Sequence, residues 1–294
     1  MKCFHEAVAL EPGFVNPYFN IVYITSFLPH AGILSVEEAY KICKKASEKA
    51  MEIDPMNARS LLAAGMFAFY FQLDMEKTKR CFYQAIELNP NLAEAQLCLG
   101  WYRLIMQERD QMEEPLNNAH RLDPLGGETI AGIAEIYFLS GNLDKAEFYI
   151  TEALSENQQN MYAIVIKSLV TGMKGNWEGE ISALESIHQV APEFNLITCY
   201  LGYAYARTGQ QAKTKEFLSQ FLEMEKNPDS PPVTLVIAIL YLVLGEKEEF
   251  YKYYEESMKA KVVTSLYVYN SPWLADVNGE ERIKELRRKY NLPE

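Results

Sequence analysis

The chain lacks the residue patterns that carry chemistry. Its five cysteines include no pair separated by two residues, and its four histidines show no ligand spacing with one another or with a cysteine. This distribution predicts no metal site and no disulfide framework, and it indicates small buried side chains in a reducing compartment. Gly-rich phosphate loops and the His-Glu-x-x-His and Gly-x-Ser-x-Gly motifs are also missing. We therefore expect no cofactor and no enzymatic activity.

Positive charge is scarce as well. Lysine and arginine together number 28 against 40 acidic residues, which gives a net charge of −12. Such a charge would repel nucleic-acid phosphates and anionic lipids. The one locally basic run, from Lys284 to Lys289, is explained by the last turns of a helix, where the helix dipole favours cations. The sequence predicts no direct contact with nucleic acid.

Long apolar runs are the third absence. The first residues, Met1 to Glu6, place polar side chains where a secretory signal needs an apolar run. The longest apolar stretches, at 61–73 and 233–244, are shorter than the ~20 residues that span a bilayer. We expect a cytoplasmic chain without a membrane contact.

What the sequence does contain is a repeat. Pro90 and Pro124 are 34 residues apart, and Pro192 follows after twice that interval. Glycines at 141, 175 and 209 keep the same step, and so do alanines at 85, 119 and 153. A 34-residue period carried by three residue types is typical of stacked helix pairs. It predicts one all-α solenoid over residues 1–294, with about seven helix pairs between 15 and 260.

The repeated positions have packing roles. The small residue at Gly65, Gly100 and Gly202 is expected to let the two helices of a pair cross closely. The alanine five residues before each proline is expected to do the same against the next unit. The glycine after each first helix suits the left-handed conformation that ends a helix. The proline starts the turn into the next unit, because it cannot donate a hydrogen bond inside a helix.

The period fails in three places. Pro12 and Pro55 are 43 residues apart, and the surplus lies in an inserted loop at Thr25–Ser35, which serves either binding or no function of its own. Residues 1–14 match the second half of a unit, so we expect the remnant of a preceding repeat in a longer protein. Residues 261–294 break the pattern, and we expect them to form a C-terminal cap with a helix from about Gly279 to Tyr290.

Two units show a family pattern. The unit that ends at Pro124 carries Leu99-Gly100, followed by Leu116 and Ala119, and the unit from Phe194 to Lys226 carries Leu-Gly-Tyr-Ala-Tyr at 201–205. These residues resemble the tetratricopeptide repeat, whose pattern is Trp-x2-Leu-Gly-x2-Tyr, then Ala-x3-Phe, then Pro. The resemblance covers essentially the whole chain. It implies a right-handed superhelical α-solenoid of helix-turn-helix repeats that binds other proteins.

The order of the units is similar to one kind of tetratricopeptide region. The long first unit and the motifs that end at Pro55, Pro90 and Pro124 resemble the region that follows a winged-helix, adenylate-cyclase or protein-kinase domain in bacterial regulators. This resemblance implies an interaction or sensing region of a signalling or transcription regulator. It transfers no DNA-binding or cyclase activity, since no motif for either is present.

By the same resemblance, the first helices line a concave groove that would hold a partner segment. Leu97 and Trp101 stand where a carboxylate clamp for a chaperone tail needs lysine and asparagine, so we reject that function. Aromatic residues and methionine dominate the inward positions and suit an apolar peptide. The alternative is that these side chains only pack between neighbouring first helices. The candidate groove residues are Tyr23, Arg59, Met66, Phe69, Glu94, Trp101, Glu135, Phe138, Tyr162 and Tyr203.

Two functions remain open at this stage. The first is a non-enzymatic protein-interaction module of a cytoplasmic bacterial signalling protein, which binds a protein or peptide segment in the concave groove. The second is a ligand- or peptide-sensing solenoid that switches an attached effector domain. The sequence names neither the partner nor the effector domain, and it leaves open whether the chain forms a homo-oligomer.

Overall fold

The chain folds as a series of stacked helix pairs. The computed structural model describes residues 2–29, 32–227, 230–260 and 264–293, and every regular element within these ranges is a helix. The predicted all-α solenoid is confirmed. The seven pairs are α2 (Val15–Phe27) with α3 (Val36–Ile53), α4 (Ala58–Phe67) with α5 (Met75–Leu88), α6 (Ala93–Ile105) with α7 (Arg109–Leu122), α8 (Gly127–Leu139) with α9 (Leu143–Glu156), α10 (Met161–Met173) with α11 (Trp177–Val190), α12 (Asn195–Arg207) with α13 (Gln211–Glu225), and α14 (Thr234–Val243) with α15 (Lys247–Lys259).

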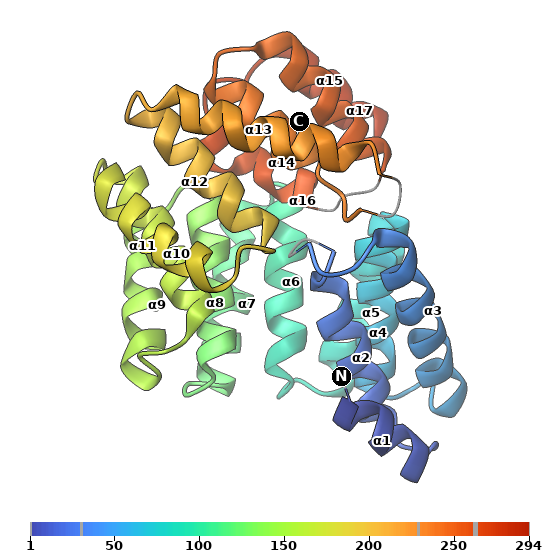
Figure 1. Ribbon diagram of the computed structural model, residues 1–294. Helices are drawn as coiled ribbons and strands as arrows, with labels where there is room; N and C mark the ends of the chain where they lie inside the picture. The colour runs from blue at the N-terminus through green and yellow to red at the C-terminus, as the bar shows by residue number, and fades with distance from the viewer. Residues whose placement is uncertain (1, 30–31, 228–229, 261–263, 294) are drawn as a thin grey trace.

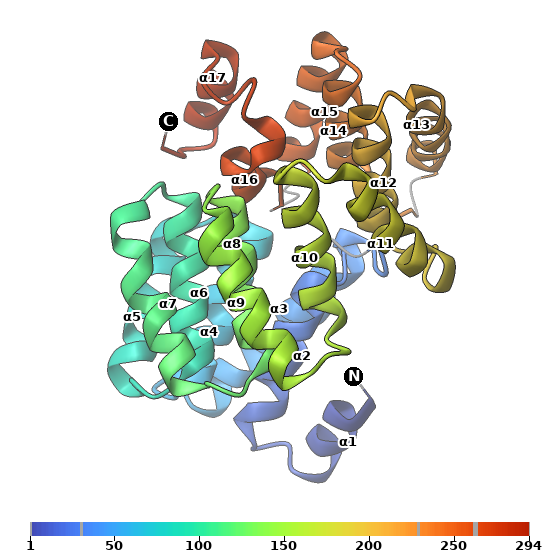
Figure 2. The same cartoon turned by 90° about the vertical axis from the view of Figure 1, so that its left-hand side faces the viewer.

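The pairs stack side by side and curve into a superhelix. The first helix of each pair faces the inside of the curve and the second helix lies outside (Figure 1). Turned by 90°, the same arrangement shows α12 to α15 and the C-terminal helices above the earlier units (Figure 2). The concave face is therefore built by α2, α4, α6, α8, α10 and α12.

Close helix crossings depend on the predicted small residues. A Cβ added to Gly100 would lie 2.5 Å from Leu116 of the same pair, and one added to Gly65 would lie 2.7 Å from the ring of Phe82. Gly202 differs, because its nearest neighbour is Leu240 of the next unit, at 2.7 Å. The repeated alanines before the turns, at 50, 85, 119 and 153, are fully buried. The spacing thus predicted the tight contacts, and the structure corrects the partner of Gly202.

The ends of the first helices fall into two kinds. Glycines 141, 175, 209 and 245 adopt the expected positive φ, between 79° and 101°. The second and third units have no glycine there, and Leu73 and Gln107 take the left-handed conformation at φ 55° and 59°. In the second unit this residue ends a π-helical turn, η1 (Ala68–Gln72), which continues α4. The sequence did not predict this turn.

The C-terminal residues cover the last pair. They form α16 (Thr264–Tyr267), the 3-10 turns η2 (Val268–Asn270) and η3 (Pro272–Leu274), and α17 (Glu281–Lys289). Helix α17 and the residue before it pair with α15 through Lys247–Glu280 at 2.7 Å and Arg282–Glu248 at 2.8 Å. Residues 261–263 and 294 of the predicted cap lie outside the described residues.

The C-terminal residues also return to the middle of the chain. Asn270 Nδ2 donates to the Leu104 carbonyl at 3.1 Å, and Arg287 Nη2 donates to the Ile105 carbonyl at 3.0 Å. Both carbonyls belong to the last turn of α6, where a helix lacks internal donors and favours cations. The tail therefore caps α6 as well as covering α15, which the sequence did not predict.

The inserted loop of the first pair reaches a distant unit. Gly32, at φ 77°, lies so close to the start of α12 that an added Cβ would be 2.8 Å from Asn195 Nδ2. Both views show this loop beside the segment that leads into α12 (Figures 1 and 2). Residues 30–31 of the loop lie outside the described residues. The insertion thus links the first unit to the sixth.

Helix α1 (Lys2–Leu10) packs on α2 and has no buried residue. Leu10 is 87% exposed, and Phe4 and Val8 are only partly buried against the core. That this helix is the remnant of a preceding repeat stays a prediction. Cys3 of this helix is exposed, so the expectation of buried cysteines holds for Cys43, Cys81, Cys98 and Cys199 only. Among the described helices, none combines the length and the apolar character needed to cross a membrane.

Candidate functional site

The ten candidate groove residues lie on the first helices, from α2 to α12, but they differ in accessibility. The polar candidates and two of the tyrosines are partly exposed: Tyr23, Arg59, Glu94, Glu135 and Tyr162. The remaining candidates are buried: Met66, Phe69, Trp101, Phe138 and Tyr203. For these five, the alternative interpretation as packing between helices describes the structure better.

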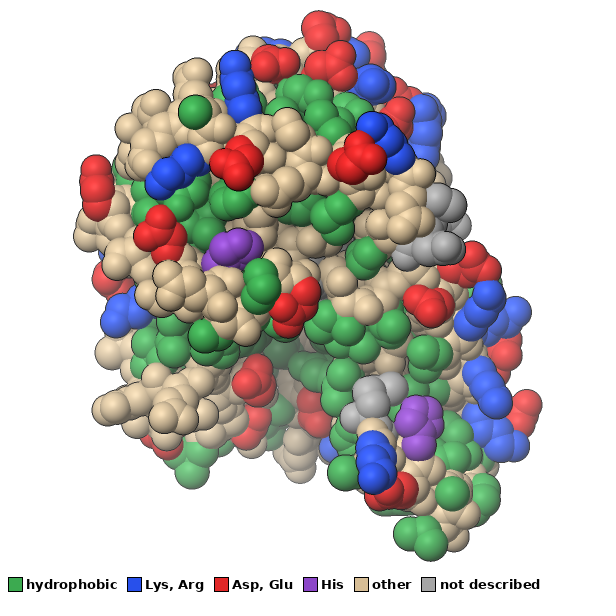
Figure 3. Space-filling view, in the orientation of Figure 1, with side chains coloured by type: hydrophobic (Ala, Val, Ile, Leu, Met, Phe, Trp, Pro, Cys, Tyr) green, Lys and Arg blue, Asp and Glu red, His purple; other side chains and the backbone are tan. Residues whose placement is uncertain are grey.

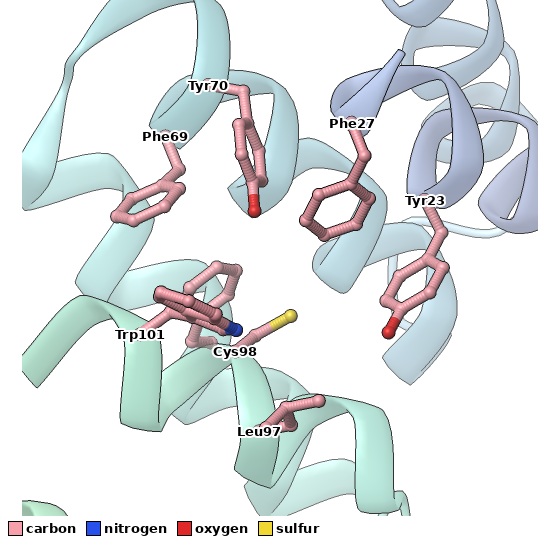
Figure 4. Close-up of a pocket in the computed structure, with 8 residues that line it drawn as sticks. Tyr23, Phe27, Phe69, Tyr70, Leu97, Cys98 and Trp101 are labelled. Carbon is pink, nitrogen blue, oxygen red and sulfur yellow. The ribbon is translucent and has the colours of Figure 1, made fainter. Parts of the chain in front are cut away.

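An aromatic pocket lies where three units meet. Tyr23 and Phe27 of α2, Phe69 and Tyr70 of η1, and Cys98 and Trp101 of α6 point towards one another (Figure 4). The rings form an edge-to-face series, with centroids 5.6 Å apart for Tyr23–Phe27 and 5.3 Å apart for Phe27–Tyr70. Such contacts are favourable for aromatic quadrupoles and hold the rings in fixed orientations.

The π-helical turn helps to explain the shape of the pocket. Phe69 and Tyr70 are consecutive, and consecutive side chains on an α-helix diverge. In η1 both line the same pocket, with their ring centroids 5.1 Å apart. The periodicity of the sequence placed Tyr23, Phe69 and Trp101 on the concave face, but it missed Phe27, Tyr70 and Cys98.

The free space in this pocket is small. It measures about 10 Å³, close to the least that one water molecule requires. A methyl-sized group fits such a space, and a metabolite does not.

Carboxylates of three segments act on Tyr23, one of the pocket residues. The pKa of the Tyr23 hydroxyl is raised by burial first, and further by Cys98, Glu94, Glu128 and Asp123. Glu94 is paired with Arg59, whose Nη2 lies 3.2 Å from its Oε1. Arg59 also lies 5.7 Å above the ring of Phe19. The acidic residues Glu94 of α6, Glu128 of α8 and Asp123 of the turn between the third and fourth units each disfavour ionisation of Tyr23 on α2.

The space-filling view shows a hollow in this part of the molecule. It lies between the N-terminal units and the middle units, below the C-terminal part, with hydrophobic side chains inside and acidic side chains at its edge (Figure 3).

At the other end, the tail fills the concave face. Trp273 packs edge-on against Phe138 of α8 with centroids 5.2 Å apart, and it stacks on Tyr200 of α12 at 5.1 Å. Phe138 is completely buried. Its prediction as a partner-binding residue is wrong for this conformation, because the chain's own Trp273 occupies its surface.

Tyr203 also lies away from the open hollow. It packs against Trp177 at 5.9 Å, and Arg207 lies 5.2 Å above the Trp177 ring. Its role here is to join the fifth and sixth units.

Glu135 and Tyr162 form a pair across two units. The Tyr162 hydroxyl donates to Glu135 Oε2. Burial raises the pKa of Glu135 to about 7, although this hydrogen bond acts in the opposite direction. The pair links α8 to α10.

The comparisons with known proteins agree with this architecture. A family model described as tetratricopeptide repeat matches residues 128–160, which cover α8 and α9. Six further helix pairs stack around that unit with the same order of elements. Residues 128–160 match a tetratricopeptide repeat, and the chain has the fold of a tetratricopeptide solenoid.

Solved structures share the fold of this chain. One from Parabacteroides merdae, a tetratricopeptide repeat protein, has a TM-score of 0.55 at 13% identity and covers 85% of this chain and 97% of its own. The Cut9–Hcn1 hetero-tetramer of the APC/C gives a TM-score of 0.63 at 16% identity, covering 98% of this chain and 51% of that chain. At such identities the likeness concerns the fold alone.

Curated relatives are larger proteins. The transcriptional regulator HilA of Salmonella typhimurium is 24% identical over 247 residues, which is 80% of this chain and 43% of HilA. The protein CTR9 homolog of Arabidopsis thaliana is 22% identical over 191 residues, 62% of this chain and 18% of that protein. The chain spans less than half the length of these relatives.

Within the described part of this repeat protein, no group of three or more histidine, cysteine or acidic side chains is arranged to hold a metal ion. The other strongly perturbed carboxylate, Glu180 of α11, was not predicted from the sequence. It is 1% exposed, its Oε2 has no hydrogen-bond partner among the described residues, and burial raises its pKa to about 8. Since it lies against Gly172 and Trp177 inside one repeat, we assign it to packing rather than to the concave face.

Glu180 gives a pH-dependent prediction. Its folded-state pKa lies above the unfolded value of 4.5, so its contribution to stability is present below that value and is lost as pH rises to about 8. Glu180→Gln removes the ionisation, and we expect it to be more stable than the wild type by about 2–4 kcal/mol at about pH 9, with little difference at about pH 4.5. Urea unfolding at both pH values measures this. Glu178→Gln, an exposed position on the same helix, is the control, and an equal gain there would contradict the assignment.

Proposed function

We propose that this chain is a non-catalytic protein-interaction module that binds a segment of a partner protein in the open part of its concave face. The observation that carries the proposal is the aromatic pocket of α2, η1 and α6, which lies beside an open hollow. Rigid aromatic side chains supply large contact areas at low entropic cost and form the anchors of many interfaces.

A peptide suits this site better than a small molecule. The pocket offers about 10 Å³, whereas ligand pockets measure roughly 300–1,000 Å³. A segment lying along the hollow would insert only the end of one side chain and make its other contacts with the half-exposed Tyr23, Arg59 and Tyr162. We therefore propose an interaction module rather than a sensor of metabolites. A sensor of peptides would use the same site and belongs to the same proposal.

The wider setting that we propose is a cytoplasmic regulator. HilA is a transcriptional regulator, and 80% of this chain aligns with 43% of HilA. The rest of HilA lies outside the aligned region. By this likeness, the chain would be the interaction region of a bacterial signalling or transcription regulator whose effector domain lies elsewhere.

Selection of displayed random peptides on the purified chain tests the function. We expect enriched peptides that bind the wild type and bind Tyr23→Ala at least about tenfold more weakly, since the variant removes one wall of the pocket. Phe148→Ala is the matched control: Phe148 is 57% exposed on α9, outside the concave face, and its loss should leave the affinity unchanged. Fluorescence anisotropy measures both affinities. Peptides that bind both variants equally would show that the concave site is not the binding site.

A further inference from the structure

The helices around the hollow contain few cations. Helices α2 and α8 have no lysine or arginine. Helix α4 contributes Arg59, which is paired with Glu94. Helix α6 contributes Arg103, which donates to Tyr83 at 3.1 Å and to the Gln111 carbonyl on the second helices. Both arginines are therefore engaged within the protein.

The acidic residues on the same side are only partly neutralised. Asp123 accepts a hydrogen bond from Thr129 at 2.6 Å, and Glu94 is paired with Arg59. Glu128, in the first turn of α8, is exposed and has no ion pair or hydrogen bond among the described residues. All three raise the pKa of the Tyr23 hydroxyl, and Glu94 lies one helical turn before the pocket residue Cys98 on α6.

Like the Glu128 carboxylate, one group inside the pocket lacks a hydrogen-bond partner among the described residues. Cys98 is 7% exposed, its sulfur points into the pocket, and its thiol has no hydrogen-bond partner among the described residues (Figure 4). A thiol behaves as a small hydrophobic group with weak hydrogen-bonding capacity. The floor of the pocket therefore favours an apolar group, and its edge favours a cation.

We infer that the partner segment carries a lysine or arginine beside a small aliphatic side chain, with the aliphatic end in the aromatic pocket and the cation against Glu128. This inference rests on the proposed function and specifies the chemistry of the partner. The aliphatic group has to be small because the free space is that of one methyl group. Charge complementarity at the edge of an interface mainly accelerates association and excludes wrong partners.

The inference also excludes a class of partners. An acidic segment would meet Glu94, Asp123 and Glu128 without a free cation on the four helices around it. Like charges placed together in an interface cost several kcal/mol, so acidic peptides should not be enriched.

The peptides selected on the wild-type chain provide the test. We expect a basic residue next to alanine or valine in the enriched sequences, and an affinity that falls as salt rises from about 0.05 M to about 0.5 M. Glu128→Lys should weaken binding by roughly tenfold, because it replaces an attraction with a repulsion. Glu114→Lys makes the same charge change at an exposed residue of α7, a second helix, and should leave the affinity within about twofold.

The outcomes separate this inference from the proposed function. Peptides that depend on Tyr23 but are neutral or acidic, and that bind Glu128→Lys as well as the wild type, would overturn the basic partner and leave the interaction site standing. Peptides insensitive to Tyr23→Ala would overturn both. Sedimentation measures whether the wild-type chain self-associates. If it does, and Glu128→Lys abolishes the self-association, a second copy of this chain is the occupant, and the inference is overturned. Because Glu128 is exposed, its replacement is not expected to affect folding, and circular dichroism verifies that.

Discussion

Replacing Trp273 with alanine is expected to destabilise the protein by about 3–5 kcal/mol. The indole is 6% exposed, stacks on Tyr200 with an interplanar angle of 17° and meets Phe138 edge-on. Truncation leaves a cavity between the fourth unit, the sixth unit and the tail, and it removes two aromatic pairs worth about 0.5–1.5 kcal/mol each. Urea unfolding followed by circular dichroism measures the loss.

Trp273→Phe is the matched control. A phenyl ring keeps part of the stacking and fills part of the volume, so we expect it to lose less than half as much stability as alanine. Hydrogen exchange adds a local measurement: residues 264–293 should exchange faster in Trp273→Ala, while α4 and α5 are unchanged. Two results together would show that the tail is not held in the concave face. The alanine variant would unfold at the same urea concentration as the wild type, and residues 264–293 would exchange quickly in both proteins.

Arg287→Ala is expected to cost a similar amount, about 3–5 kcal/mol, through a different cause. The guanidinium is fully buried, donates to the carbonyls of Ile105 and Pro293, and lies 4.0 Å above the ring of Tyr269. Burial lowers its pKa, and the hydrogen bonds and the cation–π contact offset part of the desolvation cost. Alanine leaves both carbonyls unpaired and opens a cavity.

Two further variants distinguish these causes. Arg287→Met fills the volume without the donors, and Nη1 of the arginine has no partner in the described structure, so methionine should recover part of the loss. Arg287→Lys keeps the charge but cannot bond both carbonyls from one planar group, so it should remain destabilised by about 1–3 kcal/mol. If methionine were as stable as arginine, the capping of α6 by the guanidinium would contribute nothing.

The candidate site was only partly predictable from the sequence. Periodicity placed ten residues on the concave face, and half of them, including Met66 and Phe69, are buried. A repeat pattern reports which side of a helix faces inward, and it does not report what covers that side. Tyr70 was missed because a π-helical turn, which the described residues contain in this unit alone, brings it into the pocket, and Cys98 because the period pointed to its neighbour Leu97.

The sequence by itself determined the helix pairs, their order and the tight crossings at Gly65 and Gly100. Each of these depends on contacts within a unit or with its neighbour, so the same pattern recurs every 34 residues. Only the tertiary structure decided that the tail closes one end of the concave face, since Arg287 and Ile105 are 182 residues apart. Such a contact occurs once, has no period and follows from the curvature of the whole superhelix. That curvature also decided which part of the concave face stays open to a partner.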